Sequence, residues 1–299
     1  MYSRCIICGS GNLKEILLNN LEMKQCLGCG LIWRKNFDLP SKYYQNYKYK
    51  ISDNKIKERL SNSLERIRTF RKYIDLNNLC DFGTGEGIFL KALKMFGYDN
   101  VIGIEPNIKA RQYAEANNLK VYNIGIEKIG DVIKDDNIHV VSLLHVIEHL
   151  KNPVQYLKII YDSLRKGDKI VIETPNINAY SFRKLKYKHK LIYPEHLFYF
   201  NEENLKLLLK QIGFKVVIMG KRDFNQSNLS IRESLFRLGL IKIKTSEINN
   251  LSIKTKKESI TSVNVGCRFK FLRNFIRKIL ILAVNKLGRQ EYIWTIAKK

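Results

Sequence analysis

Short apolar runs alternate with longer amphipathic segments from residue 79 to the end of the chain. The run 139–144 is apolar almost throughout, as strands of a parallel sheet are when helices cover both faces. Residues 205–212 instead repeat their apolar positions at helical spacing, and Gly213 can end that helix. Strands that alternate with helix-length segments in this rhythm predict an α/β, doubly wound, mostly parallel sheet of seven strands. The predicted strands are 79–80, 101–104, 120–124, 139–144, 169–173, 214–219 and 292–297.

A basic insert, residues 221–290, precedes the last predicted strand. Residues 269–287 have apolar side chains at helical spacing, and four basic residues lie on the other face: Lys270, Arg273, Arg277 and Lys278. The longest unbroken apolar run, 279–284, is far shorter than the ~20 residues needed to cross a bilayer, so no transmembrane segment is expected. Such a helix can lie in an anionic membrane interface, or it can pack its apolar stripe on the sheet or on a second subunit. Residues 229–240 could join it as a lid.

The formal net charge of the chain is +25, with a pI near 9.7, which favours an anionic partner. The excess is uneven, because residues 221–299 hold 18 Lys and Arg against 5 acidic residues. Part of it can be compositional, since scattered lysines usually form a solvated surface. At 299 residues, the chain is long enough for one α/β domain and a small appended unit.

Two cysteine pairs stand near the N-terminus, Cys5-x-x-Cys8 and Cys26-x-x-Cys29, with spacing in the range of zinc ribbons. Four thiolates around a tetrahedral Zn²⁺ make a closed structural site with no free position for substrate. Two disulfides are the alternative. The first residues lack the apolar region of a signal peptide, however, and in a cytosolic chain this pattern indicates metal. We therefore expect a structural zinc ribbon over residues 1–40.

A glycine-rich turn opened by an acid joins the first predicted strand to the helix after it. The turn contains Asp81, Gly83, Thr84, Gly85 and Gly87. Glycine lets the backbone turn tightly and approach a ligand where a Cβ would clash. A dinucleotide fingerprint would need glycine at position 88, which is isoleucine here, and no G-x-x-x-x-G-K-[ST] run is present. The turn therefore suits a cationic, phosphate-free nucleoside better than a pyrophosphate.

Glu105 ends the second predicted strand. It lies about twenty residues beyond the glycine turn, where a nucleotide-binding sheet presents a carboxylate to ribose hydroxyls. The alternative is a surface acid that caps the helix beginning at Pro106. The offset from the glycine turn favours ribose binding.

Two further segments follow the fourth and fifth predicted strands, residues 145–150 (HVIEHL) and 173–176 (ETPN). Together with the glycine turn and Glu105, they resemble the motifs of class I S-adenosylmethionine-dependent methyltransferases. The resemblance implies a Rossmann-like methyltransferase domain over residues 79–299, a helical linker over residues 41–78, and S-adenosylmethionine as cofactor. The cofactor-binding residues that it implies are Asp81, Gly83, Thr84, Gly85, Gly87, Glu105, Pro106, Gly125, Ile126, Leu144 and His145.

Methyl transfer to a hydroxyl or an amine needs a group that removes a proton from the acceptor. His196 follows the fifth predicted strand, and a free histidine titrates near neutrality, so we prefer it as the base. His149 is the second choice, with Glu148 beside it; packing or capping is the alternative role for each histidine. Some quinone-precursor O-methyltransferases hold a divalent ion with an E-x-x-E-H segment at this point. Here His145 replaces the first carboxylate, so we do not expect a catalytic metal.

The resemblance extends to methyltransferases of bacterial surface-polysaccharide pathways, which indicates O-methylation of a small molecule or a glycan. A lipid-linked saccharide would suit the basic insert, and the enzyme would then work in the cytoplasm, with peripheral contact at the inner membrane face. An RNA methyltransferase that binds phosphates with the ribbon and the insert is the alternative, and its binding would depend steeply on salt. A non-catalytic binding module is the third interpretation.

Overall fold

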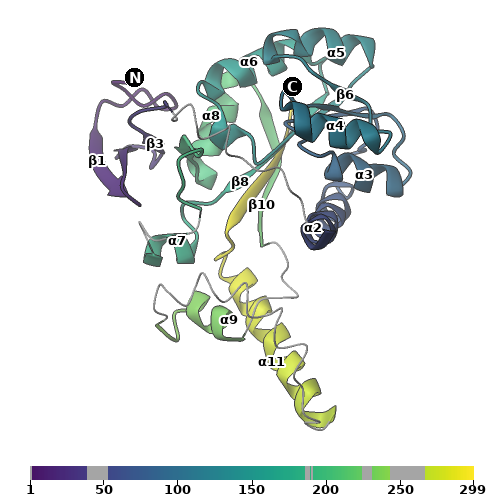
Figure 1. Cartoon of the computed structure of the whole chain (residues 1–299). Helices are drawn as coiled ribbons and strands as arrows, with labels where there is room; N and C mark the ends of the chain where they lie inside the picture. Colours follow the sequence, from purple (N-terminus) through teal and green to yellow (C-terminus); the bar gives the residue numbers. More distant parts are fainter. Residues whose placement is uncertain (1, 39–52, 186–188, 190, 224–230, 243–266) are drawn as a thin grey trace.

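The computed structural model describes residues 2–38, 53–185, 189, 191–223, 231–242 and 267–299 (Figure 1). The strands of its main sheet are β4 (Leu79–Phe82), β5 (Val101–Ile104), β6 (Val121–Tyr122), β7 (Val140–Leu144), β8 (Lys169–Pro175), β10 (Lys215–Arg222) and β11 (Tyr292–Lys298). Their order is β10-β11-β8-β7-β4-β5-β6. Strands β6, β5, β4, β7 and β8 run parallel, whereas β11 is antiparallel to both β8 and β10. The predicted doubly wound, mostly parallel fold is confirmed.

Helices cover both faces of this sheet. The described helices are α2 (Asp53–Phe70), α3 (Ile88–Met95), α4 (Ile108–Ala116), α5 (Ile129–Asp135), α6 (Pro153–Ser163), α7 (Tyr180–Leu185), α8 (Glu202–Ile212), α9 (Ile231–Arg237) and α11 (Cys267–Lys286), with 3-10 turns η1 (Ile126–Lys128) and η2 (Ile147–His149). Of these, α2, α3 and α4 pack on one face, and α5, α6 and α8 pack on the other. Alternate residues of a strand point to opposite faces. Val141 accordingly enters a core with α5, α6 and α8, whereas Val140 enters one with α2, α3 and α4.

Asparagine side chains fix the start of the helices that border the carboxyl edge of the sheet. Asn107 accepts a hydrogen bond from the Ala110 amide at α4, and Asn152 accepts one from the Gln155 amide at α6. At α8, Asn201 and Asn204 form a reciprocal capping box. These caps satisfy backbone donors that have no partner within the helix, and each contributes about 1 kcal/mol.

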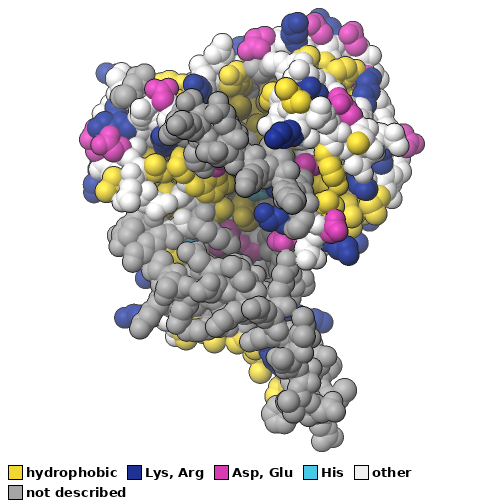
Figure 2. All heavy atoms as spheres, viewed as in Figure 1, with side chains coloured by type: hydrophobic (Ala, Val, Ile, Leu, Met, Phe, Trp, Pro, Cys, Tyr) yellow, Lys and Arg dark blue, Asp and Glu magenta, His cyan; other side chains and the backbone are white. Residues whose placement is uncertain are grey.

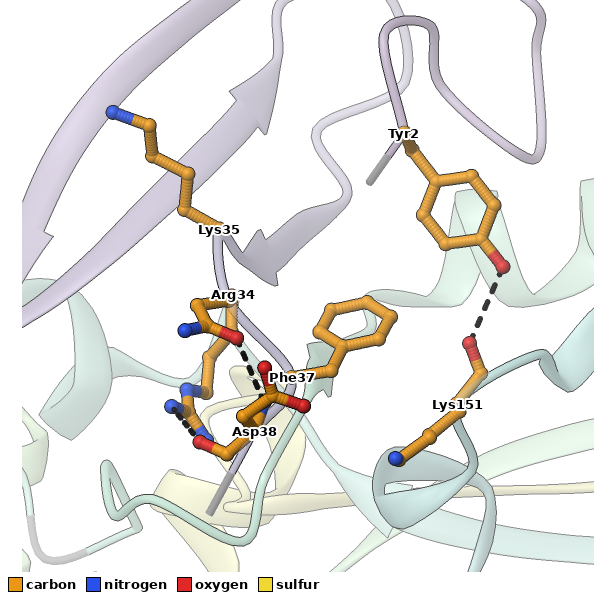
Figure 3. A pocket seen from close by; sticks show the side chains of 7 residues that line it. Tyr2, Arg34, Lys35, Phe37, Asp38 and Lys151 are labelled. Carbon is orange, nitrogen blue, oxygen red and sulfur yellow. Dashed lines mark hydrogen bonds between the residues drawn. The ribbon is translucent and has the colours of Figure 1, made fainter. Parts of the chain in front are cut away.

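The N-terminal segment forms a second, antiparallel sheet that takes one strand from elsewhere in the chain. Its order is β1 (Leu13–Leu18), β2 (Leu21–Cys26), β3 (Ile32–Arg34) and β9 (Phe198–Tyr199). Trp33 of β3 is buried in the same core as Phe198. A cavity of about 430 Å³ lies at this junction, where Tyr2 donates to the Lys151 carbonyl oxygen at 3.2 Å (Figure 3). The ribbon segment and the main sheet are thus packed as one body.

Helix α2 occupies residues 53–70 of the predicted linker and packs on the main sheet. Its Ile67 and Phe70 are fully buried, and the Phe70 ring meets Trp294 of β11 edge-on at a centroid distance of 5.6 Å. Residues 41–52 of that predicted linker lie outside the described part of the chain.

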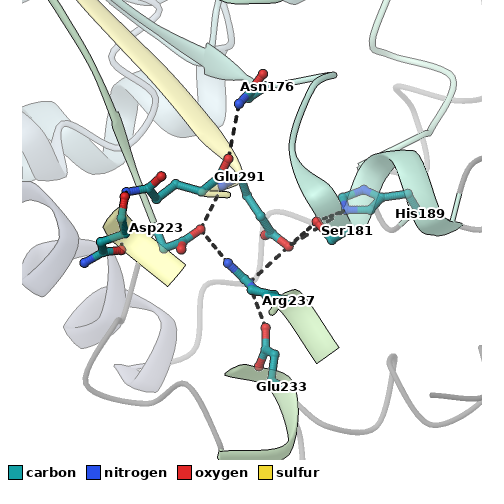
Figure 4. Close-up of polar contacts among 9 residues, drawn as sticks. Asn176, Ser181, His189, Asp223, Glu233, Arg237 and Glu291 are labelled. Atoms are coloured by element: carbon teal, nitrogen blue, oxygen red, sulfur yellow. Dashed lines mark hydrogen bonds and ion pairs between the residues drawn. The ribbon is translucent and has the colours of Figure 1, made fainter. Parts of the chain in front are cut away.

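The predicted insert contributes α9 and α11, which contact each other, and α11 projects from the carboxyl edge of the sheet (Figure 1). Residues 224–230 and 243–266 of the insert lie outside the described part. Arg237 fixes α9 to the sheet edge through ion pairs with Asp223 at 2.7 Å and Glu291 at 3.1 Å, and it pairs within the helix with Glu233 at 2.7 Å (Figure 4). Within the described residues, no helix is long and apolar enough to span a bilayer.

Candidate active site

Two neighbouring cavities lie at the carboxyl edge of the main sheet. One, of about 1120 Å³, is lined by residues that include Gly83, Gly85, Glu105, Pro106, Gly125 and His145. The other, of about 380 Å³, opens against α2 and is lined by Asp81, Gly83, Thr84, Gly85, Leu144 and His145 among others. Ligand pockets usually measure about 300–1,000 Å³, so the two together have room for a nucleoside cofactor and an acceptor. Gly87 belongs to neither lining set, and the side chain of Ile126 lies outside what the structure describes.

The three glycines of the turn all have positive φ, but they serve different purposes. A Cβ on Gly83 would lie 2.6 Å from Val146 Cγ2, and a Cβ on Gly87 would lie 2.5 Å from Leu119 Cδ1. These two glycines let neighbouring segments pack closely. Gly85, with φ of +56°, has no atom within 4 Å of its Cβ position. It therefore leaves the turn open for a ligand.

Glu105 holds the turn in place from the neighbouring strand. Its Oε2 accepts a hydrogen bond from the Gly85 amide, and its Oε1 accepts one from the Asn107 amide, both at 2.8 Å. Burial raises the pKa of this carboxyl, although the two amide donors oppose that shift. Glu105 also lines the larger cavity. An acceptor fixed at this point fits the hydroxyl groups of a ribose.

Asp81 places a second carboxylate at the base of the turn. It is almost fully buried, and the Ser142 hydroxyl donates a hydrogen bond to Oδ1 at 2.6 Å. Burial raises its pKa to about 6. Near neutral pH, Asp81 thus presents a poorly solvated negative charge to the smaller cavity, which favours a cationic ligand.

His145 stands where the two cavities meet. Its φ of 60° is unusual for a residue other than glycine. Nδ1 lies 3.4 Å from Glu148 Oε1 and Nε2 lies 3.2 Å from Glu173 Oε1. Burial disfavours the imidazolium, but these two carboxylates raise the pKa of His145 above its ordinary value. His145 is thus held between two acids that favour its charged form, where E-x-x-E-H segments have a carboxylate.

Glu148 is fully buried and belongs to neither lining set. The Thr174 hydroxyl donates to its Oε2 at 3.0 Å. Burial would raise its pKa, but His145 holds the pKa at about 2. A carboxylate this acidic is a weak proton acceptor at neutral pH, so its geometry fits the orientation of His145 better than proton removal.

The two candidate bases lie against each other, with ring centroids 4.8 Å apart. Nδ1 of His149 lies 2.9 Å from the Glu195 carbonyl oxygen, and Nδ1 of His196 lies 2.9 Å from that of Leu191. A carbonyl oxygen can only accept, so each Nδ1 carries a proton, and in the neutral ring Nε2 then keeps its lone pair. His149 lines the larger cavity, whereas His196 is buried and belongs to neither lining set. Burial also lowers the pKa of His196 to about 4. The geometry therefore favours His149 over His196, in the reverse order of our preference from sequence.

Glu148, His149 and His196 also offer ligand atoms that all lie within 4.8 Å of one another, close enough to bind a metal ion together. Glu148 already pairs with His145 and with Thr174. A cation bound here would have to share Glu148 with the His145 ring.

Helix α2 forms one wall of the smaller cavity, which the sequence did not indicate. Arg59, Asn62, Ser63 and Arg66 line it from one face of the helix. Arg66 also donates to Glu173 Oε1 from Nε at 2.8 Å and from Nη2 at 2.6 Å. The spacing of these four polar residues, i, i+3, i+4 and i+7, is the signal that could have revealed a shared face.

The four N-terminal cysteines come together as predicted. Sγ of Cys5 lies 3.5 Å from that of Cys29, Sγ of Cys8 lies 3.4 Å from that of Cys26, and all four sulfurs lie within 4.8 Å of one another. Tetrahedral Zn²⁺ with bonds of about 2.3 Å would set its sulfurs roughly 3.8 Å apart. These spacings fit Zn²⁺, and they are too long for S–S bonds. Hydrogen bonding from Cys29 lowers the pKa of Cys5 to about 5, which favours one thiolate in the cluster.

Residues 49–218, more than half of the chain, match a family model described as a methyltransferase domain. The tRNA U34 carboxymethyltransferase of Alteromonas mediterranea is 29% identical over 109 residues, which are 32% of this chain and 32% of that protein. The mitochondrial ubiquinone biosynthesis O-methyltransferase of Dictyostelium discoideum is 26% identical over 119 residues, 35% of this chain and 37% of that protein. The chain spans about a third of the length of these curated relatives.

A solved structure of an S-adenosylmethionine-dependent methyltransferase from Archaeoglobus fulgidus superposes with a TM-score of 0.51 at 22% sequence identity. The match covers 81% of this chain and 96% of that one. It shows that the two share a fold. The chain belongs to the methyltransferase domain family, and its fold is the Rossmann-like fold of the S-adenosylmethionine-dependent enzymes.

Proposed function

We propose that this methyltransferase transfers a methyl group from S-adenosylmethionine to a hydroxyl of a small molecule or glycan, with a lipid-linked saccharide as the leading candidate. The observation that supports it most is the Gly85–Glu105 hydrogen bond at the edge of a cavity that also contains His149. We further propose a cytoplasmic protein with a zinc ribbon over residues 1–40 and a methyltransferase domain over residues 79–299, joined by a linker that contains α2.

The residues that would bind the cofactor form two groups, one at each cavity. Glu105 faces the larger cavity and would accept hydrogen bonds from the ribose hydroxyls, while the open face of Gly85 admits the cofactor close to the backbone. Asp81 and the polar face of α2 border the smaller cavity, where they suit the charged amino-acid end of the cofactor. The bound cofactor supplies the methyl electrophile.

His149 would take the proton from the acceptor hydroxyl. Its Nδ1–H bond to the Glu195 carbonyl fixes the ring and leaves Nε2 as the basic atom. His196 packs against this ring and limits its rotation. General base catalysis of this kind typically contributes about 10²–10⁴ in rate.

Titration calorimetry with S-adenosylhomocysteine tests the cofactor assignment. Gly85 and Gly97 both have positive φ and open space at the Cβ position, but only Gly85 lines the cavities. We expect Gly85→Arg to weaken binding at least tenfold and Gly97→Arg to leave it unchanged. Zinc-loaded, folded wild-type protein that does not bind, or two variants that weaken binding equally, would refute the assignment.

RNA methylation is the second candidate. The net charge of +25 and the similarity to a tRNA-modifying enzyme favour it. Labelled methyl transfer into extracts of the native cells, separated into RNA, lipid and small-molecule pools, distinguishes the two. Label in RNA, together with RNA binding that weakens steeply with salt, would replace the saccharide as the proposed acceptor.

A further inference from the structure

Helix α11 exposes an apolar stripe. Leu272, Phe275, Ile276, Ile279 and Leu282, here called the stripe, are spaced at i, i+3, i+4, i+7 and i+10 on one face of the helix. Their exposed fractions are 52%, 53%, 39%, 48% and 66%. Apolar side chains gathered this closely on a surface usually mark an interaction site.

The stripe is not the face by which the helix attaches to the protein. Val284 is fully buried, and Leu280 and Ile281 are partly buried, where α11 packs near α9. At about 100° per residue, these positions lie on another side of the helix from the centre of the stripe. This inner face packs near α9, whereas the stripe lies on the exposed side of the helix.

Basic residues border the stripe on both sides. Helical spacing places Lys278 next to one side of the stripe and Arg273 beyond the other side, toward the inner face, and both are exposed. Over its whole length, residues 267–286, the helix has six basic residues and no acidic one in sequence. An apolar stripe between basic edges is typical of helices that lie in the headgroup region of anionic membranes.

Compared with a membrane, RNA and a second copy of this helix fit the stripe less well. Four of its five side chains are aliphatic, whereas RNA-binding surfaces stack bases on aromatic rings. A second copy of the same helix would bring six like charges against six. An anionic lipid surface suits both the apolar stripe and the basic residues beside it, because acyl chains can cover the stripe while headgroup phosphates pair with the basic residues.

The helix is placed so that such a contact would affect the active site. It projects from the carboxyl edge of the sheet (Figure 1), and some hydrophobic side chains in this region are visible on the surface in Figure 2. Soon after α11 ends at Lys286, the chain reaches Tyr292, whose ring meets that of His145 edge-on at 5.1 Å. Docking through α11 would turn the carboxyl edge toward the membrane.

We propose that α11 docks this enzyme on anionic lipid surfaces, with the stripe inserted among the headgroups and the basic edges on lipid phosphates. The docking does not require the acceptor to be a lipid-linked saccharide. It would, however, bring the catalytic edge of the sheet close to such a substrate.

Co-sedimentation with vesicles of phosphatidylcholine, alone or mixed with phosphatidylglycerol, tests this. We expect binding to the mixed vesicles, and we expect Ile279→Glu/Leu282→Glu to weaken it more than tenfold. Met95→Glu, at an equally exposed apolar residue on α3 (61% exposed), is the matched control and should bind as wild type. We expect Arg273→Gln/Lys278→Gln to weaken binding to the mixed vesicles about fivefold per charge removed. Lys134→Gln/Lys166→Gln removes two exposed charges near the opposite edge of the sheet and should weaken that binding little.

Cofactor binding by each variant checks that the variant is folded, because none of the substituted residues lines the cavities. The proposal is wrong if wild-type protein ignores the mixed vesicles, or if the stripe variants bind them as wild type does. It is also wrong if those variants instead abolish a dimer seen by light scattering, or binding to tRNA. A failure of methyl transfer with vesicle binding intact would count against the proposed function alone.

Discussion

Asp81 keeps a carboxylate where water hardly reaches it. Burial raises its pKa from 3.8 to about 6, so its ionisation lowers stability as the pH rises through that interval. Asp81→Asn removes the charge and keeps an acceptor for the Ser142 hydroxyl. We expect the substitution to raise the free energy of unfolding at neutral pH by about 1–3 kcal/mol, and to change it little near pH 4, where the wild-type carboxyl is largely protonated.

Urea denaturation at the two pH values measures that difference. The same variant should bind S-adenosylmethionine more weakly in calorimetry, because the smaller cavity loses a carboxylate that faces a cationic ligand. If the substitution changed the free energy of unfolding equally at both pH values, the charge of Asp81 would not be what lowers stability. Such a trade between stability and binding is common at functional sites.

His149 and His196 differ in what their removal should change. We expect His149→Ala to lower the rate of methyl transfer about 10²–10⁴-fold while S-adenosylhomocysteine binds as before. His196→Ala should mainly lower the melting temperature, because it empties a buried position that lines neither cavity. His149→Gln is the matched control for packing and should be as slow as His149→Ala. Full turnover in both His149 variants would remove it as the base.

At the scale of elements, the strands could be predicted well because each one is indicated by the apolar run of its own residues. The apolar runs before the glycine turn, before Glu105 and before His145 each became a strand whose carboxyl end reaches the site. The run 120–124 yielded only Val121–Tyr122, since an edge strand pairs on one side alone. The cysteine spacing likewise predicted four thiols that come together within a short stretch of chain.

Other elements could not be placed from their own residues. Nothing local to α2 tells that its Arg66 reaches Glu173, which lies 107 positions later. Strand β9 has two residues, and its pairing with β3 depends on contacts made across the molecule. The preference for His196 over His149 also came from local position, and the structure places the two differently. Loop position suggested access for His196, whereas its burial arises from tertiary packing against Tyr193, Tyr199 and His149.

At the scale of the whole molecule, the ribbon and the active site share a segment. The Arg34 amide donates to the Leu197 carbonyl oxygen and the Leu197 amide donates to that of Glu148, both at 2.8 Å. On the other side of β9, the side-chain amides of Asn201 and Asn204 lie within hydrogen-bond distance of the Cys29 carbonyl oxygen. The segment 191–197 that contains His196, here called the histidine loop, is therefore held between the cysteine cluster and the main sheet.

If the four cysteines hold Zn²⁺ as proposed, its removal should impair catalysis before cofactor binding. We expect chelation to lower methyl transfer at least tenfold while S-adenosylhomocysteine still binds, since Gly85 and Glu105 belong to the main sheet. The two tryptophans give a local readout, because Trp33 lies in the ribbon and Trp294 in β11. In Trp294→Phe protein, chelation should shift the fluorescence of Trp33 to the red. In Trp33→Phe protein, the signal of Trp294 should stay unchanged, and zinc addition should restore activity. Equal loss of both signals would mean that the metal supports the entire fold, and unchanged methyl transfer would show that the ribbon does not hold the histidine loop.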